Sequence, residues 1–156
     1  MQPSLKQYAD YFCMALEAEV CSRAEIINWG DRLIEQSEHP EDWMIDLSTS
    51  QNKHIQDILH LLRDVPGTAN LDLSFRLLVA KLGKQYQTIS PEQTKFLRNL
   101  YKRLVDTEVS DDLKANIYQI DVDLDWLESE VGDWSVIQQD YEDLLAIGID
   151  YRDWID

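Results

Sequence analysis

The sequence predicts an all-α fold, a bundle of about seven or eight helices. Capping-box patterns recur along the chain, with Ser22 followed by Glu25 and Ser90 followed by Gln93, and such pairs open helices. Apolar residues follow these caps at spacings of three and four, while the 156 residues include only five glycines and four prolines. A chain of this length can bury one core, so we expect a single helical domain over residues 1–156.

Six predicted helices occupy the first two thirds of the chain, and each has an apolar face. Ser4, Ser22, Pro40 and Ser90 mark starts, Pro66-Gly67 ends the fourth helix, and the fifth ends near Tyr86. Strand-like alternation is brief, at 70–75 and 147–151. The apolar faces comprise Leu5, Tyr8, Phe12 and Leu16; Ile26, Ile27, Leu33 and Ile34; Trp43, Met44 and Leu47; Ile55, Ile58, Leu59 and Leu62; Leu71, Phe75, Leu78 and Leu82; and Phe96, Leu97, Leu100, Tyr101 and Leu104.

The last third, residues 106–156, predicts two more helices. We expect Gly132 to end the first and Ser135, with Gln138, to open the second. The first has an uninterrupted apolar seam of Leu113, Ile117, Ile120, Leu124, Leu127 and Val131, and the second presents Val136, Ile137, Tyr141, Leu144 and Leu145.

Charge is concentrated in that same acidic third. Residues 106–156 contain sixteen acidic and two basic residues, whereas residues 1–105 contain fourteen and twelve, for a total charge of −16. Such a field repels nucleic acid and anionic membranes and attracts a basic protein. The stretch also contains six aromatic residues, which favours a folded surface over a disordered tail: Tyr118, Trp126, Trp134, Tyr141, Tyr151 and Trp154.

A simpler explanation is that the acidic third lies beside a basic pair of helices. Residues 65–105 contain seven basic and two acidic residues. The sequence leaves open how far the basic 76–103 region neutralises the acidic third, although an excess of negative charge must remain.

We predict a partner-binding surface in the acidic third. Asp121, Asp125 and Glu128 follow at i, i+4 and i+7, so their carboxylates share one helix face, where they could substitute for phosphates before a cationic site. A solvated face is the plainer interpretation, and each aromatic is individually more often a core residue. Trp154 is the aromatic most expected at an exposed contact. The predicted set is Asp121, Asp125, Trp126, Glu128, Asp133, Trp134, Asp140, Glu142, Asp143 and Trp154.

Metal and cofactor sites are not expected. The run Asp121–Asp125 imitates a calcium loop, but position six is Trp126 instead of glycine and position twelve is Gly132 instead of glutamate. No zinc-binding histidine pattern, nucleophile elbow or glycine-rich phosphate loop occurs, and His54 beside Asp57 is explained by exposed helix polarity. We therefore expect a protein that is not an enzyme.

The remaining features favour a cytoplasmic protein. Cys13 and Cys21 suit buried thiols in a reducing compartment, no apolar segment follows Met1 as a signal would require, and no membrane span is present.

A segment that looks family-defining runs from Ile27 to Ile34 and continues from Pro40 to Ser48. In size, helical pattern and acidic, aromatic surface the whole chain resembles the small acidic immunity proteins of bacteria, including helical ones of contact-dependent inhibition and related polymorphic toxin systems. The resemblance implies a non-catalytic inhibitor that neutralises a cognate, basic nuclease toxin by occluding its active or substrate-binding site. The alternatives are a nucleic-acid mimic that inhibits DNA-binding proteins and an adaptor subunit. The sequence leaves the oligomeric state open.

Overall fold

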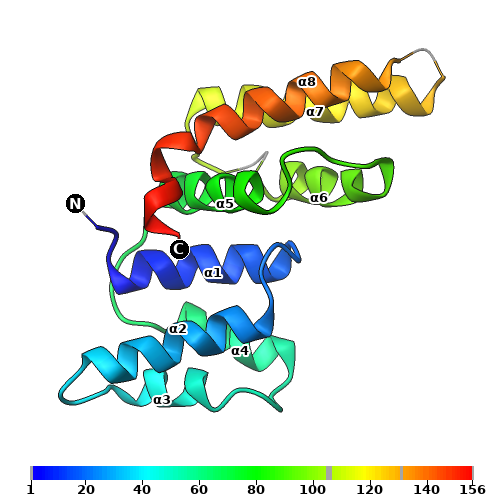
Figure 1. Cartoon of the computed structure of the whole chain (residues 1–156). Coiled ribbons are helices and arrows are strands. Elements are labelled where there is room, and N and C mark those ends of the chain that lie inside the picture. The colour runs from blue at the N-terminus through cyan, green and yellow to red at the C-terminus, as the bar shows by residue number, and fades with distance from the viewer. Residues whose placement is uncertain (1, 105–106, 131, 156) are drawn as a thin grey trace. The chain divides into compact units, whose positions relative to one another are not determined.

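The computed structural model describes residues 2–104, 107–130 and 132–155, and its regular secondary structure in these ranges is entirely helical, without a strand (Figure 1). The predicted all-α fold is confirmed, with eight α-helices of seven or more residues in the described part. Residues 71–75, which alternate like a strand, begin a helix, and residues 149–151 form a 3₁₀ turn. Asp106, Val131 and Asp156 of the sequence predictions lie outside the described residues.

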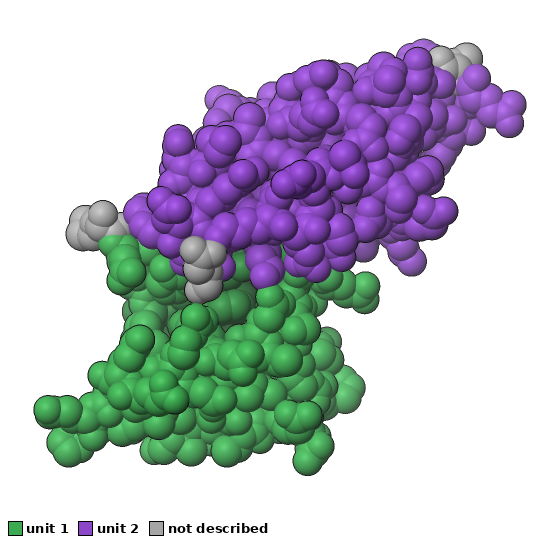
Figure 2. Space-filling model, in the orientation of Figure 1, with its two compact units in different colours: residues 1–70 green, residues 71–156 purple. Residues whose placement is uncertain are grey.

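The chain divides into two compact units, residues 1–70 and 71–156 (Figure 2). The single domain expected over 1–156 stays a prediction. No helix in the described ranges is long and apolar enough to cross a membrane.

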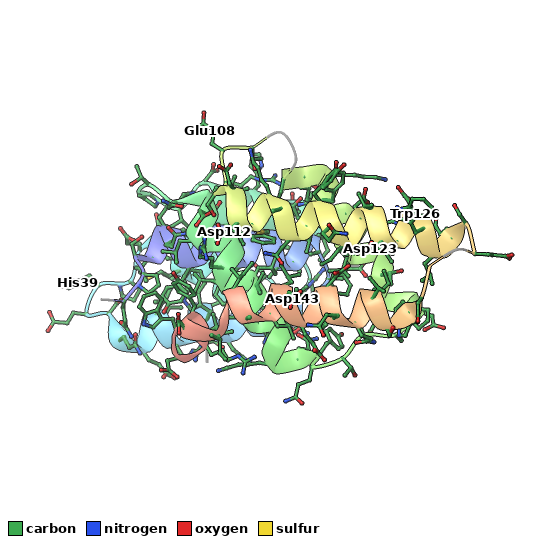
Figure 3. All side chains as sticks on the ribbon, turned by 90° about the horizontal axis from the view of Figure 1, so that it is seen from above. His39, Glu108, Asp112, Asp123, Trp126 and Asp143 are labelled. Carbon is green, nitrogen blue, oxygen red and sulfur yellow. The ribbon has the colours of Figure 1, made fainter. Side chains whose placement is uncertain are left out.

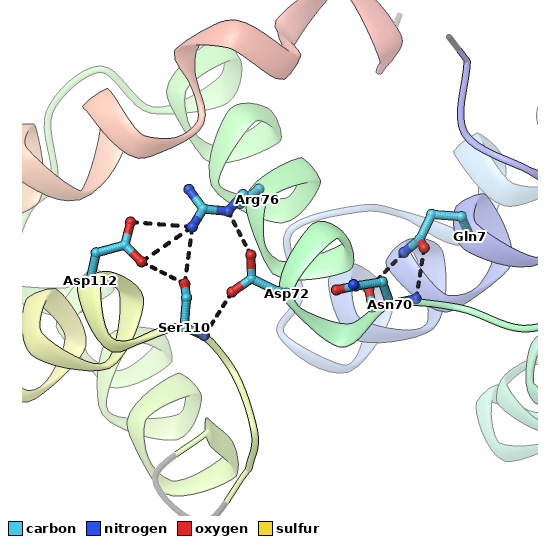
Figure 4. Close-up of polar contacts among 6 residues, drawn as sticks. All are labelled: Gln7, Asn70, Asp72, Arg76, Ser110 and Asp112. Carbon is cyan, nitrogen blue, oxygen red and sulfur yellow. Dashed lines mark hydrogen bonds and ion pairs between the residues drawn. The ribbon is translucent and has the colours of Figure 1, made fainter.

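Residues 1–70 contain α1 (Leu5–Glu17), α2 (Arg23–Gln36), α3 (Asp42–Ser48) and α4 (Ile55–Arg63). The expected caps Ser4 and Ser22 are confirmed, and Ser22 forms the full capping box with Glu25. Helix α1 packs on α4, α2 on α3, and α3 on α4. Gln7 joins the start of α1 to the end of the unit, because its side chain both donates to and accepts from the backbone of Asn70 (Figure 4).

The segment that looks family-defining packs α2 tightly against α3. Gly30 allows this approach, since a Cβ there would lie 3.1 Å from the backbone nitrogen of Ser48. The hydroxyl of Ser48 donates a hydrogen bond to Asp31. Trp29 stacks in tilted contact between Phe12 and Trp43, with ring centroids 5.0 and 5.8 Å away. These contacts give the segment a structural role in the core of this unit.

Residues 71–156 contain α5 (Leu71–Gln85), the 3₁₀ turn η1 (Pro91–Gln93), α6 (Thr94–Leu104), α7 (Asp111–Glu128), α8 (Trp134–Ile147) and the 3₁₀ turn η2 (Ile149–Trp154). Helix α7 packs between α6 and α8, and α5 packs on α8 and η2. The seam predicted on α7 is confirmed at Leu113, Ile117, Ile120 and Leu124, which are all buried, and Leu127 is half-buried.

Three predicted helix boundaries are wrong. Helix α3 begins after Glu41, so Pro40 precedes it. Helix α7 ends at Glu128, because Glu130 adopts the left-handed conformation (φ 61°) that Gly132 was expected to supply. Helix α8 is capped by the carboxylate of Asp133, which accepts from the backbone N–H of Ser135 and so starts the helix before that serine.

Candidate functional site

One arginine, Arg98 on α6, gathers the predicted row of carboxylates on α7. Its guanidinium nitrogens lie 3.5 Å from an oxygen of Asp121, 2.9 Å from Asp125 and 3.0 Å from Glu128. The three carboxylates therefore share one helix face, as their spacing predicts. Because a single cation faces three anions, an excess of negative charge remains, and the carboxylates of Asp125 and Glu128 are largely exposed.

The basic region does neutralise part of the acidic third. Besides Arg98, Arg76 on α5 pairs with Asp72 at 2.7 Å and with Asp112 at 3.2 Å, while Ser110 lies between the two carboxylates (Figure 4). Hydrogen bonding by Ser110, then by Arg76, holds the pKa of Asp112 below its usual value despite some burial. Residues 71–156 contain eighteen acidic and nine basic residues, so this unit still has a balance of −9.

A second carboxyl cluster lies between α7 and α8. Asp140 on α8 is half-buried, and burial, together with the carboxylates of Asp123 and Asp143, raises its pKa to about 7. The amide of Gln119 donates to Asp123 at 3.0 Å. Burial and the two neighbouring carboxylates therefore favour the neutral form of Asp140 (Figure 3 shows Asp123 and Asp143).

An apolar ridge runs along the outer face of α7 between these two acidic sides. It consists of Ala115, Tyr118, Val122 and Trp126, which helical spacing places on one face opposite the buried seam. Tyr118 and Trp126 each expose 57% of their surface (Figure 3 shows Trp126 near the end of α7). Large aromatics exposed to this extent beside charges are typical of binding hot spots.

A groove of about 280 Å³ opens beside this ridge, between the end of α6 and the start of α7. The rings of Tyr101 and Tyr118 lie 6.2 Å apart at its wall. Apolar side chains form most of its lining, and Lys114 is its one cationic lining residue among those described: Tyr101, Leu104, Val109, Leu113, Lys114, Ala115, Ile117 and Tyr118.

The other predicted site residues lie apart from the Arg98 cluster. Asp133 caps α8, while Glu142 and Asp143 are exposed farther along that helix. Trp134 is half-buried at the start of α8. Trp154, expected at an exposed contact, is also half-buried, in edge-to-face contact with Tyr151 at 5.6 Å. Among the predicted tryptophans, Trp126 is the one that is exposed.

The histidine and the cysteines that the sequence offers for other chemistry have simple structural surroundings. The imidazole Nδ1 of His54 caps α4 by accepting from the N–H of Gln56. Cys13 and Cys21 are buried thiols that form no disulfide within the described ranges, and burial, with the nearby Glu17 carboxylate, raises the pKa of Cys13 to about 11. Within the described ranges no three His, Cys, Asp or Glu side chains are placed to hold a metal ion.

Sequence reasoning missed two features of this surface. Arg98 was assigned to a basic region, but not to the carboxylates it contacts, because pairing across helices is not visible in local spacing. Tyr118 is one of the six aromatics of the acidic third, but the predicted site does not include it. The spacing of Ala115, Tyr118, Val122 and Trp126 at intervals of three and four is a signal that could have identified the ridge.

No protein-family model matches the chain, and neither the curated proteins nor the solved structures contain a significant match to it.

Proposed function

We propose that this protein is a non-catalytic inhibitor, similar in action to an immunity protein, that binds a basic toxin and covers its active or substrate-binding site. The observation that supports this most directly is the outer face of α7, where exposed Tyr118 and Trp126 lie beside carboxylates that Arg98 neutralises only in part. A nuclease that binds a polyanion presents lysines and arginines in its cleft, and carboxylates can occupy those positions.

The two kinds of residue contribute differently to such binding. Exposed carboxylates around Asp125 and Glu128 speed association by attracting the cationic partner, and this effect weakens as salt is added. Trp126 is desolvated only in the complex, so it contributes mainly to slow dissociation. The combination suits an inhibitor that must bind its toxin before the toxin reaches its substrate.

The test is a pull-down from the native cytoplasm, followed by a growth-protection assay with any basic toxin that is recovered. Trp126→Ser should weaken binding by at least tenfold, mainly through faster dissociation. Val136→Ser is the matched control, because Val136 is also an exposed apolar residue (44% exposed) but lies on α8. Recovery of many unrelated DNA-binding proteins would support the nucleic-acid mimic instead, and recovery without growth protection would contradict the proposal.

A further inference from the structure

The ridge and the groove of α7 form one continuous surface. Tyr118 and Ala115 belong to both, since they line the groove and also lie on the outer ridge. The ridge continues from there through Val122 to Trp126. From residue 115 to residue 126 a helix rises about 16 Å, which equals three turns. A partner element that covers the whole surface therefore needs about three helical turns.

Charge flanks the ridge on both sides. On the side that faces α6 are Asp125, Asp121 and Glu128 with their single cation, Arg98. On the side that faces α8 is Asp123, close to Asp140. An element that fits between them has an apolar stripe with lysine or arginine on both borders.

Acidic residues lie at both ends of the surface. Asp111 and Asp112 occupy the first turn of α7 near Lys114 of the groove, and Asp125 and Glu128 lie at the end of the helix. The preferred direction of a bound helix therefore depends on the dipole of α7. The N-terminus of a helix has a partial positive charge and its C-terminus a partial negative charge. Because an antiparallel arrangement brings opposite dipole ends together, a bound helix is favoured with its N-terminus over Glu128 and its C-terminus over the groove.

We propose that the outer face of α7 binds an amphipathic, basic helix of the partner, antiparallel to α7, with one large apolar side chain inserted in the groove beside Tyr118. This inference rests on the proposed function, because it names the element by which the basic partner is recognised. It adds that recognition depends on a helix of defined direction as well as on charge.

The test uses a synthetic eighteen-residue helix built of leucine and lysine, with the leucines on one face and lysines along both borders. A second peptide of identical composition, with its leucines distributed around the helix, is the charge-matched control. Binding is followed by NMR on the isotope-labelled full chain, and a nitroxide label at either end of the peptide reports its direction. We expect shifts over α6 and α7, and broadening near Glu128 from the N-terminal label only.

Two variants locate the peptide on the protein. Ala115→Arg introduces a large cation at the groove, and because Ala115 is exposed the fold should tolerate it. It should weaken peptide binding at least tenfold. Val136→Arg adds the same charge at an exposed position of α8 and should change peptide binding less than threefold. The inference would be overturned if the two peptides bound equally well, or if the NMR shifts lay on another face of the protein. It would also be overturned if the nitroxide labels showed the opposite peptide direction, or if both variants lost peptide affinity equally.

The outcome is separable from that of the proposed function. If a recovered basic toxin is still bound and neutralised by the Ala115→Arg variant, the helix inference fails and the inhibitor function stands. If the peptide binds as described but pull-downs yield no basic partner, the proposed function fails on its own experiment.

Discussion

Arg98 determines how much of the negative charge on the α6–α7 face reaches solvent. Its side chain is 24% exposed, and its guanidinium contacts the carboxylates of Asp121, Asp125 and Glu128. Unpaired like charges at this helical spacing repel each other, so the row is stable in the folded chain partly because this cation lies among them. The same ion pairs reduce the charge that a cationic partner meets.

Replacement of Arg98 should therefore have opposite effects on stability and on binding. Arg98→Gln should lower the free energy of unfolding by about 1 kcal/mol, since three partly screened ion pairs are lost. It should also raise the association rate with a basic partner at low salt, because the face becomes more negative. Denaturant titration and stopped-flow kinetics measure the two quantities.

Lys102→Gln is the matched control for this prediction. Lys102 is exposed on the same helix, and the substitution removes one positive charge as well. A stability loss as large as that of Arg98→Gln would contradict the specific role of Arg98, as would an association rate that falls in Arg98→Gln.

Asp140 makes stability depend on pH in the direction opposite to an ordinary salt-bridged carboxylate. Burial, followed by Asp123 and Asp143, raises the pKa of Asp140 to about 7, whereas an aspartate in an unfolded chain titrates near pH 4. Between these values the folded protein holds a proton that the unfolded chain has lost. The contribution of Asp140 to stability therefore falls as pH rises from about 4 to about 7, and the loss in the free energy of unfolding reaches its full size above about pH 7.

Asp140→Asn should remove this cost. Near pH 4 the substitution should have little effect on the free energy of unfolding. At pH 8 it should raise the free energy of unfolding by an amount on the order of 1 kcal/mol, after allowance for solvent screening of a half-exposed group. Denaturant titrations across this pH range measure the difference. Glu142→Gln, an exposed substitution on the same helix, should show no such growth with pH, and an Asp140→Asn variant that loses stability at pH 8 would contradict the prediction.

At the scale of the helices, the starts at serine capping boxes are predictable, whereas the starts of α3 and α8 and the end of α7 are not. Ser4, Ser22 and Ser90 act through short-range hydrogen bonds that the sequence displays directly. The ends of α1 and α7 instead use Glu19 and Glu130 in the left-handed conformation, which sequence patterns assign to glycine or asparagine. Both glutamates are exposed, and glutamate does not mark a left-handed position in the sequence.

The end of α1 gives a stability prediction. After Glu17, the N–H of Glu19 bonds the carbonyl of Leu16 and the N–H of Val20 bonds that of Ala15, which is a Schellman motif. Glu19→Gly should raise the free energy of unfolding by about 0.5 kcal/mol, because the relief of left-handed strain exceeds the added freedom of the unfolded chain. Thermal and denaturant unfolding measure this.

Glu38→Gly tests the sign of that effect. Glu38 is also exposed and outside a helix, but its φ is not positive. Glycine there adds only freedom to the unfolded chain, so stability should fall slightly. A loss of stability in both variants would show that Glu19 is not strained.

At the scale of the whole molecule, the charge distribution follows the units only partly. Residues 1–70 contain twelve acidic and five basic residues, so they too are acidic, and the strongly acidic 106–156 region shares a unit with the basic helices before it. The sequence predicted the fold class, most helices and the row at Asp121, Asp125 and Glu128. It could not predict Arg98 as their partner or the groove beside Tyr118, because both depend on how α6 packs against α7.

The unit of residues 71–156 should be sufficient to bind the partner. Each unit has fully buried apolar side chains of its own: Ile26, Leu47, Ile58 and Leu62 in residues 1–70, and Phe75, Leu78, Leu97 and Tyr141 in residues 71–156. A fragment of residues 71–156 should therefore fold as a helical protein with a cooperative melt, although with lower stability than the full chain, since small domains bury less surface.

The fragment contains α6, α7 and α8. It should therefore bind the basic partner, or the leucine–lysine helix, with an affinity within about threefold of that of the full chain. Trp126→Ser should weaken binding equally in the fragment and in the full chain. Circular dichroism and calorimetry measure folding and affinity. A fragment that folds but binds more than tenfold more weakly would place part of the binding surface in residues 1–70, and one that remains unfolded would show that the units depend on each other.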